Sequence, residues 1–262
     1  MKDLRQPPGY PEGHDLLRGK RVLVTAAAGT GIGYAAAKRC MEEGAVALIS
    51  DIHEGRLADA ADRLEQEVGQ RPHTALCNVT EQADVDALFA AVAGTLGGVD
   101  VVINNAGLGG TANVMEMTDE QWSVVLDVTL NGTFRMTRAA MQAMAGGSGG
   151  VIVNNASVLG WRAQKGQAHY AAAKAGVMAL TRCAALEGAE HGIRINAVAP
   201  SIAMHAFLAK VTTEELLEEL TAREAYGRAA EVWEVANVMV FLASEYSTYM
   251  TGEVVSVSSQ HP

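Results

Sequence analysis

The amino-acid sequence predicts an α/β protein: a single doubly wound domain in which a parallel sheet of about seven strands carries helices on both faces. Strand-like and helix-like runs alternate along the whole chain, and a glycine-rich turn follows the first strand-like run. Such alternation is typical of parallel strands that are covered by helices on both sides. The chain has 262 residues, of which 49% are hydrophobic, so it can bury one large core.

The first strand, turn and helix predict a nucleotide-binding site. Residues 20–25 form the strand, the small residues 26–33 form the turn, and residues 34–43 form the helix. Small residues let the backbone approach a pyrophosphate, whose charge the helix N-terminus then stabilises. The next strand, 45–50, ends in Asp51, where a carboxylate accepts hydrogen bonds from the ribose of NAD and repels the 2′-phosphate of NADP. The alternative is a glycine turn that only packs the helix on the strand.

The later elements continue the same alternation. Further strands are expected at 73–77, 100–103, 150–154, 193–198 and 253–257. Helices are expected over 55–68, 80–95, 118–144, 167–190, 213–224 and 231–244. The glycine-rich stretch at 146–150 is too short to separate domains. We therefore expect one dinucleotide-binding and catalytic domain over residues 18–262, preceded by an arm, 1–17, that lies on the surface or on a neighbouring subunit.

Two side chains four residues apart indicate acid–base chemistry. Tyr170 and Lys174 share one face of a helix, and an adjacent ammonium favours the ionised form of a phenol. A tyrosine so paired can exchange a proton near neutral pH. Ser157 lies 13 residues before Tyr170 and adds a hydroxyl that can hold the reacting oxygen. A tyrosine–lysine pair of this spacing also occurs by chance, so its weight depends on the nucleotide-binding turn upstream.

In these features the chain resembles the short-chain dehydrogenases/reductases that consist of a single Rossmann domain, over roughly residues 18–258. The landmarks are the glycines of the turn, N-N-A-G at 104–107, the serine, tyrosine and lysine named above, N-A-V-A-P at 196–200 and T-G at 251–252. More narrowly, the runs at 24–33, 154–164, 195–203 and 256–262 are similar to actinobacterial dehydrogenases of steroid C- and D-ring degradation. Such proteins are often labelled 3-oxoacyl-thioester reductases.

The resemblance implies a role for each site residue. Tyr170 is the acid in carbonyl reduction and the base in alcohol oxidation. Lys174 lowers the pKa of Tyr170 and binds the nicotinamide ribose, and Ser157 positions the substrate oxygen. Asn78 and Val79 flank the adenine, and the hydride belongs to the nicotinamide. The residues expected to contact NAD are Gly29, Thr30, Gly31, Ile32, Gly33, Asp51, Asn78, Val79, Asn105, Ala106, Gly107, Tyr170, Lys174, Pro200, Ile202 and Ala203.

Several positions depart from the family pattern. The glycine turn is one residue longer than usual, with Ala27 in place of the first glycine, and alanine tolerates left-handed backbone poorly, so a different path is predicted. Thr129 replaces an asparagine that is thought to hold a water in a proton relay behind the lysine. Thr129 is therefore a catalytic candidate, unless the relay is rerouted; Asn131 faces elsewhere on the helix and is no substitute. His205 stands where a threonine often binds the carboxamide, and Ser258–Ser259 replace two glycines.

The loops expected around the nicotinamide are apolar, which suits a bulky hydrophobic carbonyl or alcohol. The expected substrate contacts are Leu108, Val158, Trp161, Met204, His205, Phe207 and Leu208. The alternative is that several of these only pack the segment after Pro200. Arg162 and Lys165 either meet the phosphates of a CoA thioester or are solvated charges. His169, next to Tyr170, is expected to be structural.

Composition argues against several other classes of function. Thirty acidic against twenty basic residues give a formal charge of −10, which disfavours nucleic acid or an anionic membrane as a partner. Residues 1–17 lack the apolar core of a signal peptide, and no apolar run reaches the roughly 20 residues of a membrane span. Cys40, Cys77 and Cys183 are interpreted as small buried side chains of a reduced, cytoplasmic protein, and neither disulfides nor metal ligands are expected.

Three hypotheses follow for the function. The first is an NAD-dependent dehydrogenase that acts on a hydroxy or oxo group of a ring-containing, steroid-derived acyl-CoA. The second is a 3-oxoacyl-thioester reductase of linear chains carried by acyl carrier protein or CoA; a preference for NADPH would favour it, and Asp51 opposes it. The third is a non-catalytic dinucleotide sensor, which the intact serine, tyrosine and lysine oppose. The resemblance also implies a homotetramer assembled through the helices at 118–144 and 167–190.

Overall fold

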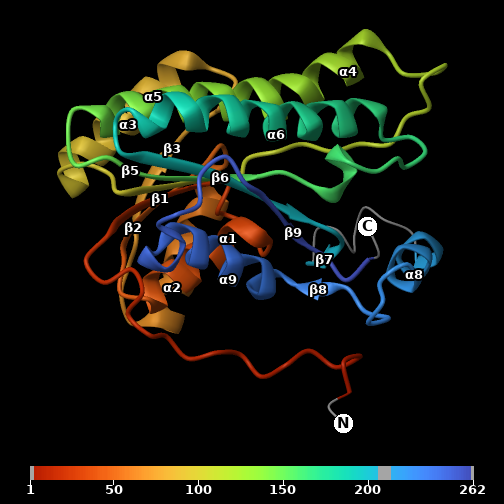
Figure 1. The fold of residues 1–262 in the computed structure, drawn as a ribbon, viewed down its shortest axis with the longest axis horizontal. Coiled ribbons are helices and arrows are strands. Elements are labelled where there is room, and N and C mark those ends of the chain that lie inside the picture. The colour runs from red at the N-terminus through yellow and green to blue at the C-terminus, as the bar shows by residue number, and fades with distance from the viewer. Residues whose placement is uncertain (1–2, 206–213, 261–262) are drawn as a thin grey trace.

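The computed structural model describes residues 3–205 and 214–260. Its main sheet is parallel and has seven strands in the order β3-β2-β1-β4-β5-β6-β9, which confirms the predicted fold class (Figure 1). The strands are β1 (Arg21–Thr25), β2 (Val46–Asp51), β3 (His73–Leu76), β4 (Val101–Asn104), β5 (Gly150–Asn155), β6 (Ile193–Pro200) and β9 (Val254–Val257). The strand order reverses between β1 and β4, which is where ligands bind in sheets of this kind.

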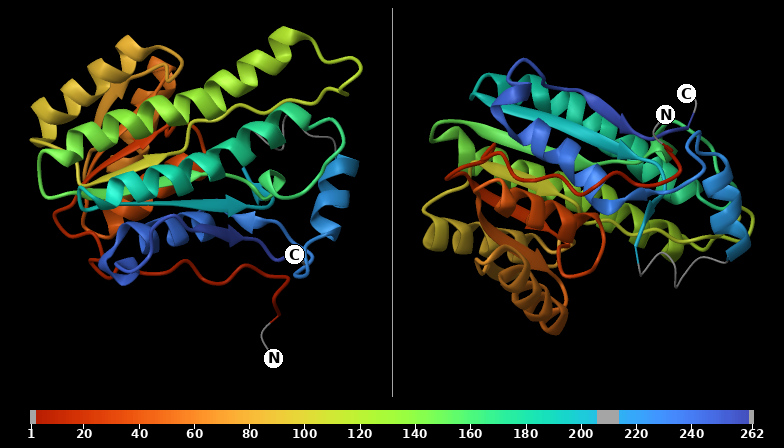
Figure 2. Two further views of the ribbon diagram at one scale, coloured as in Figure 1. Left: turned by 45° about the horizontal axis from the view of Figure 1, so that its top comes forward. Right: turned by 90° about the horizontal axis from the view of Figure 1, so that it is seen from below.

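Helices cover both faces of the sheet (Figures 1 and 2). One face carries α1 (Ile32–Glu42), α2 (Glu54–Val68) and α9 (Val232–Ala243); the other carries α3 (Gln82–Leu96), α4 (Asp119–Leu126), α5 (Gly132–Ala145) and α6 (Ala168–Ala189). Strand residues alternate between the faces, so Val22 and Val24 pack in the core cluster of α1 and α9 while Leu23 packs in that of α3 and α5. Within the described residues, no helix is long and apolar enough to cross a membrane.

The described residues between β6 and α9 lie beyond the carboxyl ends of the sheet strands. After β6, the short strand β7 (Ala203–Met204) pairs with β8 (Ala230–Glu231), and α8 (Glu214–Ala222) stands clear of the two helical layers (Figure 2). Strands β6 and β9 both point toward α8 in the left view of Figure 2. This region therefore borders the edge of the sheet at which ligands are expected.

The single helix expected over 118–144 is interrupted. A π-helical segment, Asp127–Asn131, separates α4 from α5. Thr129 lies in this segment, fully buried, and its carbonyl accepts a hydrogen bond from the Thr133 hydroxyl at 2.7 Å. Single π-helical turns are rare and often occur at functional sites. The interruption turns Thr129 toward the sheet and away from solvent.

Residues 3–17 lie along the outside of α1 and α9. The Tyr10 ring packs edge-on against Trp233, 5.4 Å between centres, and its hydroxyl donates to Glu42 at 2.7 Å. The buried carboxylate of Glu43 accepts hydrogen bonds from the amides of His14 and Leu16, at 2.8 and 3.1 Å. These contacts hold this segment on the surface of its own subunit.

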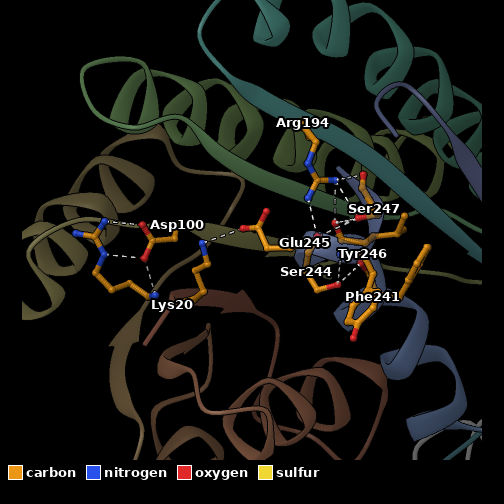
Figure 3. A network of polar contacts seen from close by, with 10 residues as sticks. Lys20, Asp100, Arg194, Phe241, Ser244, Glu245, Tyr246 and Ser247 are labelled. Atoms are coloured by element: carbon orange, nitrogen blue, oxygen red, sulfur yellow. Dashed lines mark hydrogen bonds and ion pairs between the residues drawn. The ribbon is translucent and has the colours of Figure 1, made fainter. Parts of the chain in front are cut away.

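The edge of the sheet opposite the carboxyl ends is closed by a polar network (Figure 3). Arg194, at the start of β6, donates to the carbonyls of Ser244 and Ser247 at 3.0 and 2.8 Å. The adjacent Glu245 forms an ion pair with Lys20 at 3.3 Å, just before β1. The network joins the end of α9 to two strands that are distant in sequence.

Candidate active site

Ser157, Tyr170 and Lys174 lie together beyond the carboxyl end of β5. Ser157 begins a 3₁₀ turn, Val158–Gly160, where its hydroxyl accepts a hydrogen bond from the Leu159 amide at 3.2 Å. Tyr170 and Lys174 lie in the first two turns of α6. The Ser157 hydroxyl lies close enough to the Tyr170 phenol to favour the ionised form of the phenol. The structure thus brings together the three residues in which the sequence predicted catalysis.

Lys174 is only 2% exposed, and its ammonium lies beside the tyrosine. Its Nζ donates to the carbonyl oxygen of Asn155 at 2.5 Å and lies 5.5 Å from the centre of the Tyr170 ring. A Cβ on Gly107 would lie 3.4 Å from Nζ, so glycine leaves room for the lysine. Asn155 was not among the predicted site residues, although a polar side chain at the end of a buried strand was a usable signal for it.

Burial dominates the ionisation of both groups. It raises the pKa of Tyr170 to about 12, although the nearby Ser157 hydroxyl favours the phenolate. It lowers the pKa of Lys174 to about 8. Desolvation is therefore the larger influence on the pKa of Tyr170 in this structure, and the lowering of that pKa by Lys174, whose Nζ lies 5.5 Å from the ring centre, stays a prediction. The neutral phenol is the form that can donate a proton.

The glycine turn takes an unusual path at Ala26. This residue has left-handed backbone, with φ of 50°, whereas Ala27, which stands in place of the family's first glycine, does not. Such a conformation costs a non-glycine residue roughly 1–2 kcal/mol. The Ala26 carbonyl accepts a hydrogen bond from Asn105 Nδ2 at 3.1 Å. A Cβ on Gly33 would lie 2.4 Å from both of those atoms, so only glycine permits this contact between the turn, α1 and β4.

The N-terminus of α1 fits the pyrophosphate of a dinucleotide. Gly31 precedes the helix and makes no side-chain hydrogen bond that caps it. Gly29 and Thr30 are exposed, and a Cβ on Gly29 would meet only the Gly31 amide nitrogen, at 3.8 Å. Ile32, the first helical residue, is partly exposed. The amides and the positive dipole end of α1 therefore face a surface that an anion can approach.

Asp51 ends β2 beside this turn. Its carboxylate accepts hydrogen bonds from the amides of Ala28 and His53, at 3.2 and 3.1 Å. Burial raises the pKa of Asp51, and the backbone hydrogen bonds and the charge of Arg56 oppose that rise. The residue is thus placed one strand away from the α1 N-terminus, where a ribose attached to the pyrophosphate would lie.

Asn78 and Val79 follow β3 on the same side. The side-chain oxygen of Asn78 accepts from the amide and the hydroxyl of Thr80, at 3.1 and 2.9 Å, which leaves only its NH₂ group to meet a base edge. Val79 is buried, and a Cβ on Gly132 would lie 2.7 Å from it. Val79 therefore packs against the start of α5 as well as bordering the expected adenine site.

Backbone and side-chain amides form hydrogen bonds across the carboxyl ends of β1, β4 and β5. The Thr25 hydroxyl accepts hydrogen bonds from the amides of Asn105 and Ala106, at 3.0 and 3.2 Å. The Asn155 amide donates to Asn105 Oδ1 at 2.9 Å, and its own Oδ1 is buried with no partner among the described residues. An unpaired buried acceptor is costly, and a bound cofactor or an ordered water can satisfy it. The residues present thus fit a dinucleotide.

Thr129 faces the site but its hydroxyl is already used. It donates to the Leu108 carbonyl at 3.1 Å and accepts from the Leu108 amide at 2.9 Å. Gly107 lies between Thr129 and Lys174: a Cβ there would be 3.8 Å from the Thr129 hydroxyl. Asn131 is exposed and donates to Asp127 instead. The hydroxyl of Thr129 therefore fixes the loop after β4, directly beside the lysine.

The predicted substrate contacts divide into two groups. Leu108 and Trp161 are 39% and 51% exposed, whereas Val158 is 5% exposed and packs inward. Met204 is partly buried in β7, and the ring of His205 would lie 3.8 Å from a Cβ on Gly31, next to the α1 N-terminus. Phe207 and Leu208 lie outside the described residues. Of the expected cofactor contacts after β6, Pro200 and Ala203 are buried and Ile202 is partly exposed.

The other side chains singled out in the sequence differ in their exposure and contacts. Arg162 is not simply solvated: its guanidinium donates to Gln260. Lys165 is exposed. His169 is buried, and its Nδ1 accepts from the Tyr170 amide at 2.9 Å, which fits the structural role expected for it. Cys40 and Cys77 are buried as predicted, but the prediction for Cys183 is wrong, because it lies on the outer side of α6 and is exposed.

The comparisons with known proteins agree on one family. A family model described as enoyl-(acyl carrier protein) reductase matches residues 26–259. The chain is 60% identical over 261 residues to the (5R,7aS)-5-hydroxy-7a-methyl-1-oxo-2,3,5,6,7,7a-hexahydro-1H-indene-carboxyl-CoA reductase of Mycobacterium tuberculosis, covering 99% of this chain and 100% of that protein. It is 35% identical over 242 residues to a 3-oxoacyl-[acyl-carrier-protein] reductase of Vibrio cholerae, covering 92% and 97%.

Solved structures lead to the same family. The crystal structure of a short chain dehydrogenase from Mycobacterium smegmatis matches with a TM-score of 0.88 at 55% identity, covering 99% of this chain and 100% of that one. Fold, sequence and the arrangement of the serine, tyrosine and lysine therefore agree. The chain belongs to the short-chain dehydrogenase/reductase family of oxidoreductases.

Proposed function

We propose that the protein interconverts a secondary alcohol and a ketone on a ring-containing, steroid-derived acyl-CoA, with NAD(H) as the hydride carrier. The observation that carries the substrate class is the 60% identity, along the whole chain, to a reductase whose name specifies a hydroxylated, methylated hexahydroindene CoA ester. Exposed Leu108 and Trp161 beside the catalytic residues support an apolar, bulky substrate.

In this proposal Tyr170 exchanges the proton. Its neutral phenol donates to the ketone oxygen in reduction, and its phenolate takes the hydroxyl proton in oxidation. Ser157, which lies beside the phenol, binds the same oxygen, and the ammonium of Lys174, 5.5 Å from the ring centre, stabilises the phenolate. Thr129 holds Leu108 and so keeps the wall of the site beside the lysine in place. NAD, when bound, supplies or accepts the hydride.

The NAD preference rests on Asp51. Replacing Asp51 with Ala is expected to lower the ratio of kcat/KM for NAD over NADP about tenfold, because the carboxylate no longer repels a 2′-phosphate. The exposed Asp59 of α2 offers a matched control, and Asp59→Ala should leave the ratio unchanged. A parent enzyme that already prefers NADP would contradict the cofactor proposal.

The substrate class is tested by comparing two alcohols. Reduction of NAD is followed with a hydroxylated bicyclic steroid-fragment CoA thioester and with a linear 3-hydroxyacyl-CoA. Faster turnover of the bicyclic compound supports the proposal. Preference for the linear compound supports the second candidate, a general 3-oxoacyl-thioester reductase, which the similarity to the Vibrio cholerae protein favours. Full activity of Tyr170→Phe would overturn the reaction mechanism for both.

We further propose a cytoplasmic homotetramer, with residues 1–17 as an arm and 18–262 as one domain. The helical layer of α4, α5 and α6 exposes Trp122, Val124 and Phe134, which are 39%, 48% and 44% exposed in the single chain. Burying such side chains against a second copy is favourable. Light scattering of the purified protein tests the assembly: a monomer in solution would contradict it.

A further inference from the structure

Ser259 and Gln260 are hydrogen-bonded to a buried carboxylate that lies just after α8. Glu224, just after α8, is 4% exposed. It accepts hydrogen bonds from the amide and the hydroxyl of Ser259, at 3.1 and 2.8 Å, and from the amide group of Gln260, at 2.8 Å. The Ser259 carbonyl accepts in turn from the Ala225 amide at 2.9 Å. Breaking these three hydrogen bonds would leave a buried carboxylate without donors, which is costly in free energy.

Gln260 links Glu224 to a second segment of the chain, the turn that contains Arg162. Its NH₂ group donates to Glu224, while its side-chain oxygen accepts from the guanidinium of Arg162. A neutral amide thus stands between a carboxylate and a cation and is oriented by both, because each end of the amide meets its complementary partner. We call Arg162, Glu224, Ser259 and Gln260 the C-terminal clasp. Arg162 and Gln260 are 98 residues apart in sequence.

The clasp ends on the turn that carries the catalytic serine. The Arg162 amide donates to the Val158 carbonyl at 2.9 Å, which closes the turn that Ser157 begins. Trp161, next to Arg162, is half exposed at the substrate side. Moving Arg162 therefore moves the peptide that positions both Ser157 and Trp161, whereas the α1 N-terminus has no part in this network.

We propose that Glu224 and Gln260 are positioning residues for the substrate site: through Arg162 they hold the Ser157 turn in its reactive geometry. The inference rests on the proposed function, since it assigns these residues to the substrate side of that site. Arg162 is then a structural cation of the clasp, and the CoA phosphates are bound elsewhere. Glu224 and Gln260 thus act on the reaction through Arg162 and not by contact with substrate or cofactor.

The test uses Gln260→Ala and Glu224→Gln in the full chain. The amide of the second variant places an NH₂ group among three donors, so it disrupts the clasp without changing the shape of the side chain. For both variants kcat is expected to fall about tenfold with a smaller change in KM, because a modest displacement of a positioning group is costly in the transition state. The dissociation constant of NAD, measured by fluorescence titration, should stay within about twofold.

A second measurement does not depend on turnover. Trypsin cleavage after Arg162 or Lys165 should accelerate several-fold in both variants, because a released turn opens more often. Arg223→Gln is the matched control: Arg223 is the neighbour of Glu224, but it is exposed and pairs only with Glu219 among the described residues. It should leave kinetics and cleavage unchanged.

The kinetic and proteolysis results test the clasp separately from the proposed substrate. Unchanged kcat and unchanged cleavage would overturn the clasp, and so would an equal loss of NAD affinity, which would mark a general structural role. If the parent turns over only the linear thioester, the proposed substrate fails. The clasp is still tested in that case, with the linear substrate and with trypsin.

Discussion

A partly buried cation, Arg194, and a buried one, Lys174, lie at opposite edges of the sheet and differ in how fully they are hydrogen-bonded. Arg194, at the amino end of β6, donates to Leu242, Ser244, Ser247 and Met250, with five hydrogen bonds between 2.8 and 3.4 Å (Figure 3). Lys174, beyond the carboxyl end of β5, donates to one described acceptor, the Asn155 carbonyl. Burial lowers the pKa of both groups.

The difference separates a structural cation from a reactive one. Both terminal nitrogens of the Arg194 guanidinium donate to carbonyls or a hydroxyl of the turn that they hold, so its charge stabilises the fold. The ammonium of Lys174 uses one of its three N–H donors on a described acceptor, and the other two can meet a ligand. The stability of the fold alone does not require a charge at this position. Incomplete satisfaction of a buried ion is costly, and such groups cluster at functional sites. Two substitutions, which give three predictions, can break or sharpen this comparison.

The largest effect is expected on activity from Lys174→Met. Loss of the ammonium removes the charge that stabilises the phenolate of Tyr170, and kcat/KM should fall about 10³-fold, roughly 4 kcal/mol in the barrier. Nicotinamide absorbance measures the rate. Lys20→Met, which removes an exposed lysine at the other edge, is the control and should keep full activity. A Lys174→Met enzyme within tenfold of the parent would remove Lys174 from the mechanism.

The next effect is expected on stability from Arg194→Met. The substitution removes five charge-assisted hydrogen bonds from the turn after α9, although each of its carbonyls keeps another donor, and the free energy of unfolding should fall by about 3 kcal/mol. Urea denaturation followed by circular dichroism measures it. The folded fraction should retain its kcat, because Arg194 lies at the opposite edge from Tyr170. A variant as stable as the parent would show that the five hydrogen bonds contribute little.

The smallest effect is a gain of stability in Lys174→Met that depends on pH. The pKa of Lys174 is about 8 in the fold against an ordinary 10.5, so the unfolded chain binds more protons between these values and the parent gains stability as pH rises through that window. The methionine variant lacks this dependence. It should be about 2 kcal/mol more stable than the parent at pH 7, and the advantage should vanish above about pH 10. Denaturation at both pH values checks the sign; a variant that is less stable at pH 7 would contradict the cost assigned to the charge.

Much of the site could be predicted because its signals are local. The i, i+4 spacing of Tyr170 and Lys174 needs only a helix, and the turn before α1 needs only small residues between a strand and a helix. Asp51 follows from the same argument, since it ends the next strand of one βαβ unit. The prediction failed where an extra residue or a distant partner intervenes. The sequence did not specify that Ala26 carries the left-handed backbone of the altered turn, and a π-helical segment interrupts the expected long helix at Thr129.

The sequence by itself determined the order of strands and helices, the doubly wound fold and the positions of the serine, tyrosine and lysine predicted to act in catalysis, because periodicity and short spacings specify them. Only the tertiary structure decided the ionisation of Tyr170, the contact of Thr129 with Leu108 and the junction of Arg162 with Gln260 and Glu224. Each of these depends on groups that are far apart in the chain and meet only in the fold. Desolvation and long-range hydrogen bonds are properties of that assembled environment, and no local pattern of residues encodes them.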